Sequence, residues 1–286
     1  MLTHPANETR TAESSWQANL NLSFARREDR TLLARKSHFG PLQIQKVLYP
    51  EGRDICHATL LHPPGGIADG DSLEITAQLD PGARVCLTTP GATKWYRCPL
   101  GESQQRLRFS LAEGAALEWL PRENILFDAS EVRMGLDVEL ASGAQFLGWE
   151  LLCFGRRACG ETWRHGGLHL GTNIRQSGRA LWSERAHVRA GSGFETSAVG
   201  LAGYSVSGTL LTAGANIDSA LLTACRSIVP SEAGPRVGIS ALPQVLVARY
   251  LGHSSQDAFN WFASLWQVLR PGLLGVAASA PRIWAC

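Results

Sequence analysis

Apolar and polar residues alternate along most of the first two thirds of the chain, which is the pattern of half-buried strands. Polar residues separate Trp16, Ala18, Leu20, Leu22 and Phe24, so one face of this segment is predicted to be buried. We expect further short strands at 31–36, 42–48 and 55–62, separated by turns at 26–30, 38–41, 50–52 and 63–66. This series of strands and turns predicts a mainly β fold.

A Leu-x-x-Gly-Ala turn recurs three times, with its glycines at Gly82, Gly114 and Gly143, 32 and 29 residues apart. Alternating apolar residues precede each turn. We interpret each unit as a hairpin whose glycine takes a positive φ. Hairpins that repeat every ~30 residues can stack into a helical, solenoid-like arrangement, each covering its neighbour's apolar face. Coincidence among common β-turns is the alternative.

The periodicity changes near residue 205, where helical spacing appears. We expect a strand at 205–211, a helix capped by Asn216, and two strands at 237–242 and 244–251. A final helix is predicted to begin at Ser254 or Ser255 and to end before Pro271. Apolar residues cover more than one stripe of this helix, so it is buried in its own fold or against a partner.

These patterns predict one domain over residues 16–286 after a flexible tail at 1–15. The domain is divided into a β-hairpin stack at 16–204 and an α+β part with two helices at 205–286.

Composition narrows the class of protein. The 286 residues are 44% hydrophobic and 18% charged, with a net charge of +2. This supports a folded core and gives no fold-wide electrostatic footprint for nucleic acid. No apolar run is long enough to span a membrane, the first residues do not resemble a signal peptide, and the seven cysteines are interpreted as free thiols. We therefore expect a cytoplasmic protein without a membrane partner.

Some residue types that bind metals lie close together, but their spacing matches no metal motif. They are Cys56, His57 and His62, and then Cys153, Cys159, His165 and His169. Core cysteines and surface histidines are the simpler interpretation, so these residues are assigned no role. Phosphate-loop, dinucleotide-binding and nucleophile-elbow motifs are not found in the sequence.

Several segments match a known family in order: HFGPL at 38–42, YPEG at 49–52, LHPPGGI at 61–67 with GD at 70–71, TPGATK at 89–94 with Tyr96, LEWLP at 117–121, GR at 155–156 with GE at 160–161, RP at 270–271 and PRIW at 281–284. Together they resemble the urease accessory protein family UreD, called UreH in some organisms. Asp69 stands where the family usually has Gly. Near the end of the chain, Ser279 stands where many members have Cys, and Cys286 stands where Thr is usual.

The resemblance implies a non-enzymatic maturation factor built from stacked β-sheets and two helices. Family members form a complex with UreF and the GTPase UreG on apo-urease. The expected role is scaffold and nickel conduit for GTP-dependent assembly of the dinickel active site. Nickel(II) would be a transient cargo, and no tightly bound cofactor is expected.

The resemblance also implies which residues a passing ion would meet: Asp71, Glu150, Glu184, Thr93 and Lys94. Carboxylates and water bind nickel more weakly than imidazole and thiolate clusters do, so spaced acids suit a passage. Alternatively, these acids cap turns or pair with Arg156, Arg157 or Arg185.

Two further groups of residues are expected to have structural or contact roles. Structural turns are expected at Gly65, Gly66 and Gly70, in addition to the three repeat glycines, and partner contacts at Trp266, Arg282 and Trp284.

Two other functions stay open on the sequence alone. One is a β-solenoid enzyme acting on carbohydrate with paired carboxylates in a groove. The nine tryptophans are scattered rather than periodic, which disfavours it. The other is a pure interaction scaffold through which no metal passes.

Overall fold

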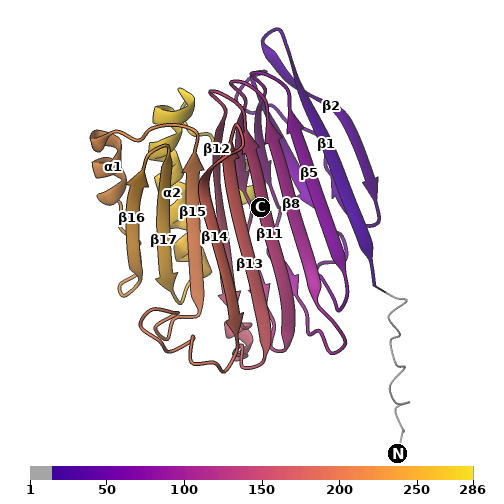
Figure 1. Cartoon of the computed structure of the whole chain (residues 1–286), viewed down its shortest axis with the longest axis vertical. Coiled ribbons are helices and arrows are strands. Elements are labelled where there is room, and N and C mark those ends of the chain that lie inside the picture. The colour runs from indigo at the N-terminus through magenta and orange to yellow at the C-terminus, as the bar shows by residue number, and fades with distance from the viewer. Residues whose placement is uncertain (1–14, 286) are drawn as a thin grey trace, which may run out of the picture.

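Two β-sheets packed face to face form most of the molecule, and two helices lie beside the larger sheet (Figure 1). The computed structural model describes residues 15–285. Most of the tail predicted at 1–15, and Cys286, therefore lie outside the described residues.

The smaller sheet has seven strands. In spatial order they are β14 (Arg179–Arg189), β13 (Gly166–Gln176), β11 (Ser130–Leu140), β8 (Ser103–Leu111), β5 (Ser72–Leu79), β1 (Gln17–Arg27) and β2 (Arg30–Phe39). β1 confirms the strand predicted from the first alternating segment. Its alternate residues Ala18, Leu20, Leu22 and Phe24 are buried, whereas Trp16, expected on the same face, precedes the strand and is 47% exposed.

The larger sheet has ten strands. Its main path is β16 (Arg236–Leu242), β17 (Val245–Gly252), β15 (Val206–Ala213), β12 (Gln145–Phe154), β9 (Ala116–Leu120), β6 (Arg84–Thr88), β4 (Ile55–Leu61) and β3 (Gln43–Ile44). The short strand β10 (Asn124–Leu126) pairs with β12 and with β7 (Thr93–Trp95). The strand expected at 42–48 is reduced to the two residues of β3.

The repeat is a solenoid-like stack, as predicted, but its units are not hairpins. Each Leu-x-x-Gly-Ala turn joins a strand of the smaller sheet to a strand of the larger one. β5, β8 and β11 pair in parallel in one sheet, and β6, β9 and β12 pair in parallel in the other. The two strands of a unit thus bond to the next unit rather than to each other, a distinction that local sequence does not encode.

The repeat turns themselves stack. Gly82, Gly114 and Gly143 have φ values of 69°, 64° and 68°, which glycine adopts without steric cost. The Gly82 N–H donates to the Glu113 carbonyl at 2.9 Å, and the Gly114 N–H donates to the Ser142 carbonyl at 3.1 Å. Each turn is therefore hydrogen-bonded to the turn of the next unit.

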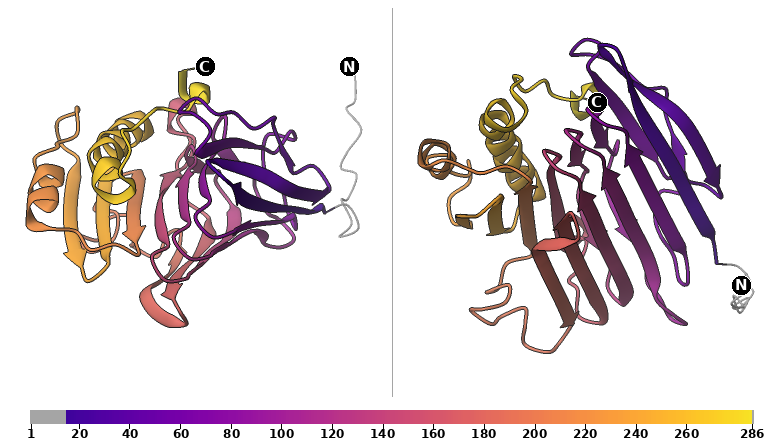
Figure 2. Two further views of the ribbon diagram at one scale, coloured as in Figure 1. Left: turned by 90° about the horizontal axis from the view of Figure 1, so that it is seen from above. Right: turned by 45° about the horizontal axis from the view of Figure 1, so that its top comes forward.

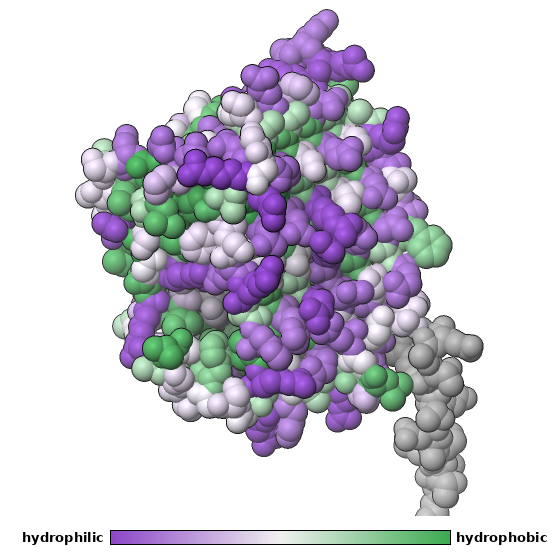
Figure 3. Space-filling view, viewed as in Figure 1, coloured by the Kyte–Doolittle hydropathy of each residue, from purple (hydrophilic) through white to green (hydrophobic). Residues whose placement is uncertain are grey.

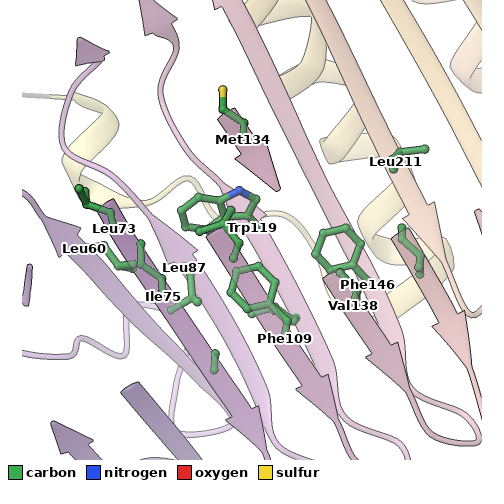
Figure 4. Packing of buried hydrophobic residues seen from close by; sticks show 14 of the residues in the cluster. Leu60, Leu73, Ile75, Leu87, Phe109, Trp119, Met134, Val138, Phe146 and Leu211 are labelled. Atoms are coloured by element: carbon green, nitrogen blue, oxygen red, sulfur yellow. The ribbon is translucent and has the colours of Figure 1, made fainter. Parts of the chain in front are cut away.

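Two apolar clusters hold these layers together. The first fills the space between the sheets and includes Ile75, Phe109, Trp119 and Phe146 (Figure 4). The second lies between the larger sheet and helix α2 (Ser255–Leu274). Strands β12, β15 and β17 therefore have apolar side chains on both faces, whereas the outward face of the seven-stranded sheet is largely hydrophilic (Figure 3).

The helices begin and end at slightly different residues than predicted. Helix α1 (Ser219–Arg226) is capped by Asp218, whose carboxylate accepts from the Leu221 N–H at 2.7 Å; Asn216 instead accepts from the Gln244 N–H. Ser254 caps α2 as expected, but Pro271 lies inside this helix rather than after its end. A proline within the last turn removes one hydrogen bond without stopping the helix.

Helix α2 lies along the outer side of the larger sheet, away from the smaller sheet (Figure 2). Its broad apolar surface is buried within the chain's own fold, on β12, β15 and β17. Among the helices of residues 15–285, none combines the length and hydropathy that crossing a membrane requires.

Candidate functional site

A cavity of about 340 Å³ lies between the sheets, and several of the matched sequence segments meet in its wall. His62, Gly65 and Gly66 come from one segment and residues 89–94 from another. Trp119 and Pro121 contribute from the segment at 117–121. Residues far apart in sequence therefore line one internal space because the solenoid places them at one end of adjacent coils.

A second, smaller cavity of about 40 Å³ adjoins the first. The wall residues common to both are Gln105, Leu107, Trp119, Met134 and Glu150. The smaller cavity continues to Thr172, Glu184 and Thr209. Glu150 thus lines both cavities, and the combined lining of the two cavities, which extends from Lys94 to Glu184, is called the path below.

Glu150 is a carboxyl group in an otherwise mostly apolar junction. It belongs to β12 and points into the space between the sheets, where its remaining accessible surface borders the cavities. Burial and the nearby Glu184 carboxylate raise its pKa to about 7, and Arg249 opposes this rise. Both the protonated and the ionised form of this group are therefore accessible near neutral pH.

Glu184 forms an ion pair at the far end of the path. Its Oε1 atom accepts from Nη2 of Arg249 at 2.7 Å, and Nη1 of Arg249 donates to the Thr209 hydroxyl at 2.7 Å. Arg249 lies on β17 of the larger sheet and Glu184 on β14 of the smaller one. The sequence suggested that Glu184 shares a face with Trp182, and β14 confirms it by alternation. Arg249 was missed, although a charge within the alternating series Val245, Val247, Arg249 and Leu251 is a readable signal.

Asp71 does not line either cavity. Its Oδ1 accepts from the Trp16 N–H and its Oδ2 from the Ala68 N–H, both at 2.8 Å, and the residue is buried. The carboxylate therefore closes the turn before β5 and anchors the start of β1. This geometry corresponds to the structural alternative, in which the acid caps a turn.

Thr93 and Lys94 lie in the wall of the larger cavity, on the short strand β7. Lys94 is exposed, which places a cation at the outer end of the path. His62 shares this wall, and its buried Nε2 has no hydrogen-bond partner among the described residues. Burial lowers the pKa of His62, while Asp71 opposes the change, so the neutral ring with a free nitrogen is favoured.

The Gly-rich segment packs tightly beside this wall. A Cβ on Gly66 would lie 2.4 Å from Cε2 of Tyr96, so only glycine allows the approach. Gly65 and Gly70 have positive φ values of 78°. All three glycines predicted as structural turns therefore have a geometric requirement.

The residues expected to contact partners have different surroundings. Trp266 is only 1% exposed and donates from Nε1 to Glu118 at 2.6 Å. It therefore belongs to the core between α2 and the larger sheet, and the prediction that it contacts a partner is wrong for this structure. Trp284 is partly buried and packs on the rings of Trp149 and Phe259. Arg282 is exposed.

The possible cysteine and histidine metal clusters do not assemble. His165 pairs with Asp128 at 3.1 Å, and His169 stacks on His187 with ring centroids 3.9 Å apart. The described cysteines are free thiols, as expected, and only Cys159 among them is exposed. Across residues 15–285, no three His, Cys, Asp or Glu side chains come together as a metal site.

The fold and the site define a class: a β-solenoid protein with an internal path lined by a few polar groups. Residues 17–285 match the family model described as "UreD urease accessory protein". The chain belongs to this family, as its sequence motifs indicated. Its members are accessory proteins rather than catalytic enzymes, which confirms a non-enzymatic protein and goes against the carbohydrate-active alternative.

Curated relatives agree over nearly the whole chain, and each is named urease accessory protein UreD. The relative from Methylobacillus flagellatus is 46% identical over 273 residues, 96% of this chain and 95% of its own length. The relative from Dechloromonas aromatica is 48% identical, covering 94% of both chains. The relative from an Azoarcus species is 47% identical, covering 96% of this chain and 95% of its own.

Proposed function

We propose that this chain acts in urease maturation as a scaffold through which nickel(II) passes to the apo-enzyme. Its partners in this proposal are urease, UreF and the GTPase UreG, assembled in the cytoplasm, and nickel is a transient cargo. Membership of the UreD family supports the role in urease maturation. The two adjoining cavities support the passage.

The path offers weak ligands at intervals, which suits transfer. Glu150 and Glu184 are hard oxygen donors, and carboxylate and water oxygens hold nickel less tightly than thiolates or imidazole clusters do. The two glutamates border the same small cavity, so an ion leaving Glu150 meets the second carboxylate within the same space. His62 adds a single imidazole nitrogen at the wall of the larger cavity.

Asp71 has a supporting role in this proposal. Its bonds to Trp16 and Ala68 fix the turn that follows His62 and the Gly-rich segment. Replacing it should alter the wall of the cavity and the stability of the chain, rather than remove a ligand from the path.

The test replaces both glutamates of the path. Glu150→Ala with Glu184→Ala is co-expressed with urease and the accessory proteins, and nickel per urease is measured after purification. We expect the complex with its partners to form normally and urease to contain several-fold less nickel. The matched control removes two exposed glutamates, Glu28 and Glu113, which lie away from both cavities.

The two remaining explanations give different results. Normal nickel loading in the double variant would leave a scaffold without metal passage. Loss of partner binding in the double variant, but not in the control, would show that the two acids serve the assembly of the complex.

A further inference from the structure

A row of polar side chains crosses the inner face of the larger sheet. Glu150 on β12 is in register with Thr209 on β15, and Thr209 is in register with Arg249 on β17. On the smaller sheet, Thr172 of β13 is in register with Glu184 of β14. Four of these residues line the smaller cavity, and Arg249 contacts two of the four. The polar groups are therefore concentrated at one level of an apolar interior.

Arg249 joins the two rows at the side of the molecule. Its two Nη atoms donate to Glu184 and to Thr209, which both line the smaller cavity. The side chain of Arg249 is 43% exposed and that of Glu184 is 25% exposed. The guanidinium therefore lies between the cavity and solvent, where β14 and β17 of opposite sheets approach each other.

We propose that Arg249 acts as a gate on the solvent side of the smaller cavity and keeps Glu150 and Glu184 from trapping the ion. This inference rests on the proposed function. Arg249 acts on the cargo through Glu184 and is thus a positioning residue. A guanidinium beside the last carboxylate repels an arriving cation and compensates the charge that would otherwise hold it. Contact with a partner can open the pair, because a partly exposed ion pair contributes little net stability.

Without Arg249, two carboxyl groups would face the small cavity with no compensating cation bound to them. Two adjacent glutamates with water form a chelating site for a divalent ion. A nickel ion that should pass through the cavity would then stay bound to the two carboxyl groups. A gate therefore differs from a plain structural pair, since loss of a structural pair gives no gain in metal binding.

The test compares Arg249→Met, which keeps the length of the side chain, with Arg249→Lys, which keeps its charge. Each full-length variant is purified with its co-expressed accessory partners and dialysed against micromolar Ni²⁺, and the retained nickel is measured by mass spectrometry. We expect Arg249→Met to retain about tenfold more nickel, as removal of a unit charge at ion-pair distance implies. Urease matured with this variant should contain less nickel. Arg249→Lys should behave as the unaltered chain.

Three results would overturn the inference: retention unchanged in Arg249→Met, equal gains in the Met and Lys variants, or loss of soluble protein in Arg249→Met. The third would mark the ion pair as structural. Adding Glu184→Gln to Arg249→Met should abolish the extra retention.

The failure of the gate and the failure of the conduit are distinguishable. Normal urease nickel in the Glu150→Ala, Glu184→Ala chain refutes the conduit. Deficient nickel there, together with unchanged retention in Arg249→Met, refutes the gate alone.

Discussion

Replacing Arg270 by methionine should be among the most destabilising single changes in this chain. Arg270 lies in the last turns of α2 and is 0% exposed. Its guanidinium donates to Glu118 at 2.9 and 3.1 Å and to Glu51 at 2.8 Å. Glu51 also pairs with His57 at 2.5 Å. Methionine fills similar space but leaves both carboxylates buried without their main cation.

The loss of stability follows from these two buried carboxylates, which would no longer have a cationic partner in Arg270. Burial already raises the pKa of Glu118, and Arg270 and Trp266 oppose that rise. Burial also acts against ionisation of Glu51, but hydrogen bonds from His57 and Arg270 outweigh it and hold its pKa below the usual range. Removing one partner of a buried ion pair costs about 3–5 kcal/mol. We expect a loss of that size in the free energy of unfolding of Arg270→Met.

Urea denaturation followed by tryptophan fluorescence measures this loss, with Arg179→Met as the control at an exposed position. Adding Glu118→Gln should recover part of the loss, because it neutralises one stranded carboxylate. A loss below about 1 kcal/mol, or fully additive costs in the double variant, would refute the reasoning, since coupled groups in contact do not add.

Three further results are expected. Glu150 has a folded-state pKa of about 7, above its ordinary value of 4.5, because of burial and the nearby Glu184. Its contribution to the stability of the folded chain is therefore complete below pH 4.5 and is lost as pH rises through 7. Glu150→Gln should remove this decline and be more stable than the unaltered chain by about 1–3 kcal/mol at pH 8, and equal pH profiles in urea titrations would contradict it. Gly114→Ala should lower the free energy of unfolding by about 1 kcal/mol or more, because φ of Gly114 is 64°. The control Gly171→Ala should have little effect, because nothing lies within 4 Å of its new Cβ. Similar melting temperatures for the two variants would argue against strain at the turn. Cys159 should be the one thiol among residues 15–285 that iodoacetamide modifies in the folded chain, since the other described cysteines are buried, and mass spectrometry that finds rapid modification elsewhere would show local opening.

The strands β1, β5, β8 and β11 were predictable because a buried face imposes a period of two, whatever the partner strand. The pairing was not predictable, because the same turn at Gly82 can fold back as a hairpin or cross to the opposite sheet. Which of these occurs depends on hydrogen bonds to the next unit, about 30 residues away. The solenoid-like stack was therefore inferred correctly from the repeat, while the hairpins within it were wrong.

The helix boundaries failed for local reasons. Asp218 and Asn216 are both good capping residues, and the choice between them depends on which side chain reaches a free N–H of the first turn. Pro271 was expected to follow the helix, yet Arg270 beside it is held by Glu118 and Glu51, which fixes the last turns of the helix in place. Tertiary contacts thus override a local stop signal.

The buried ion network explains why several matched segments, far apart in sequence, belong to one structural feature. Glu51, Glu118 and Arg270 come from segments at 49–52, 117–121 and 270–271, and they meet beneath α2. No periodicity relates these positions. The contact between their side chains therefore could not be predicted from the sequence, although each segment could be recognised in it.

The internal path follows from a property of stacked coils. In-register pairing of β5, β8 and β11, and of β6, β9 and β12, keeps inward side chains of one level side by side. A polar residue at such a level tends to be costly in an apolar interior, unless neighbouring strands supply polar groups at the same level. The antiparallel strands β14, β15 and β17 do this with Glu184, Thr209 and Arg249, next to Glu150 of the repeat. The strands added outside the repeat therefore complete the polar path and supply the cation Arg249, at the side where β14 and β17 of the two sheets approach each other.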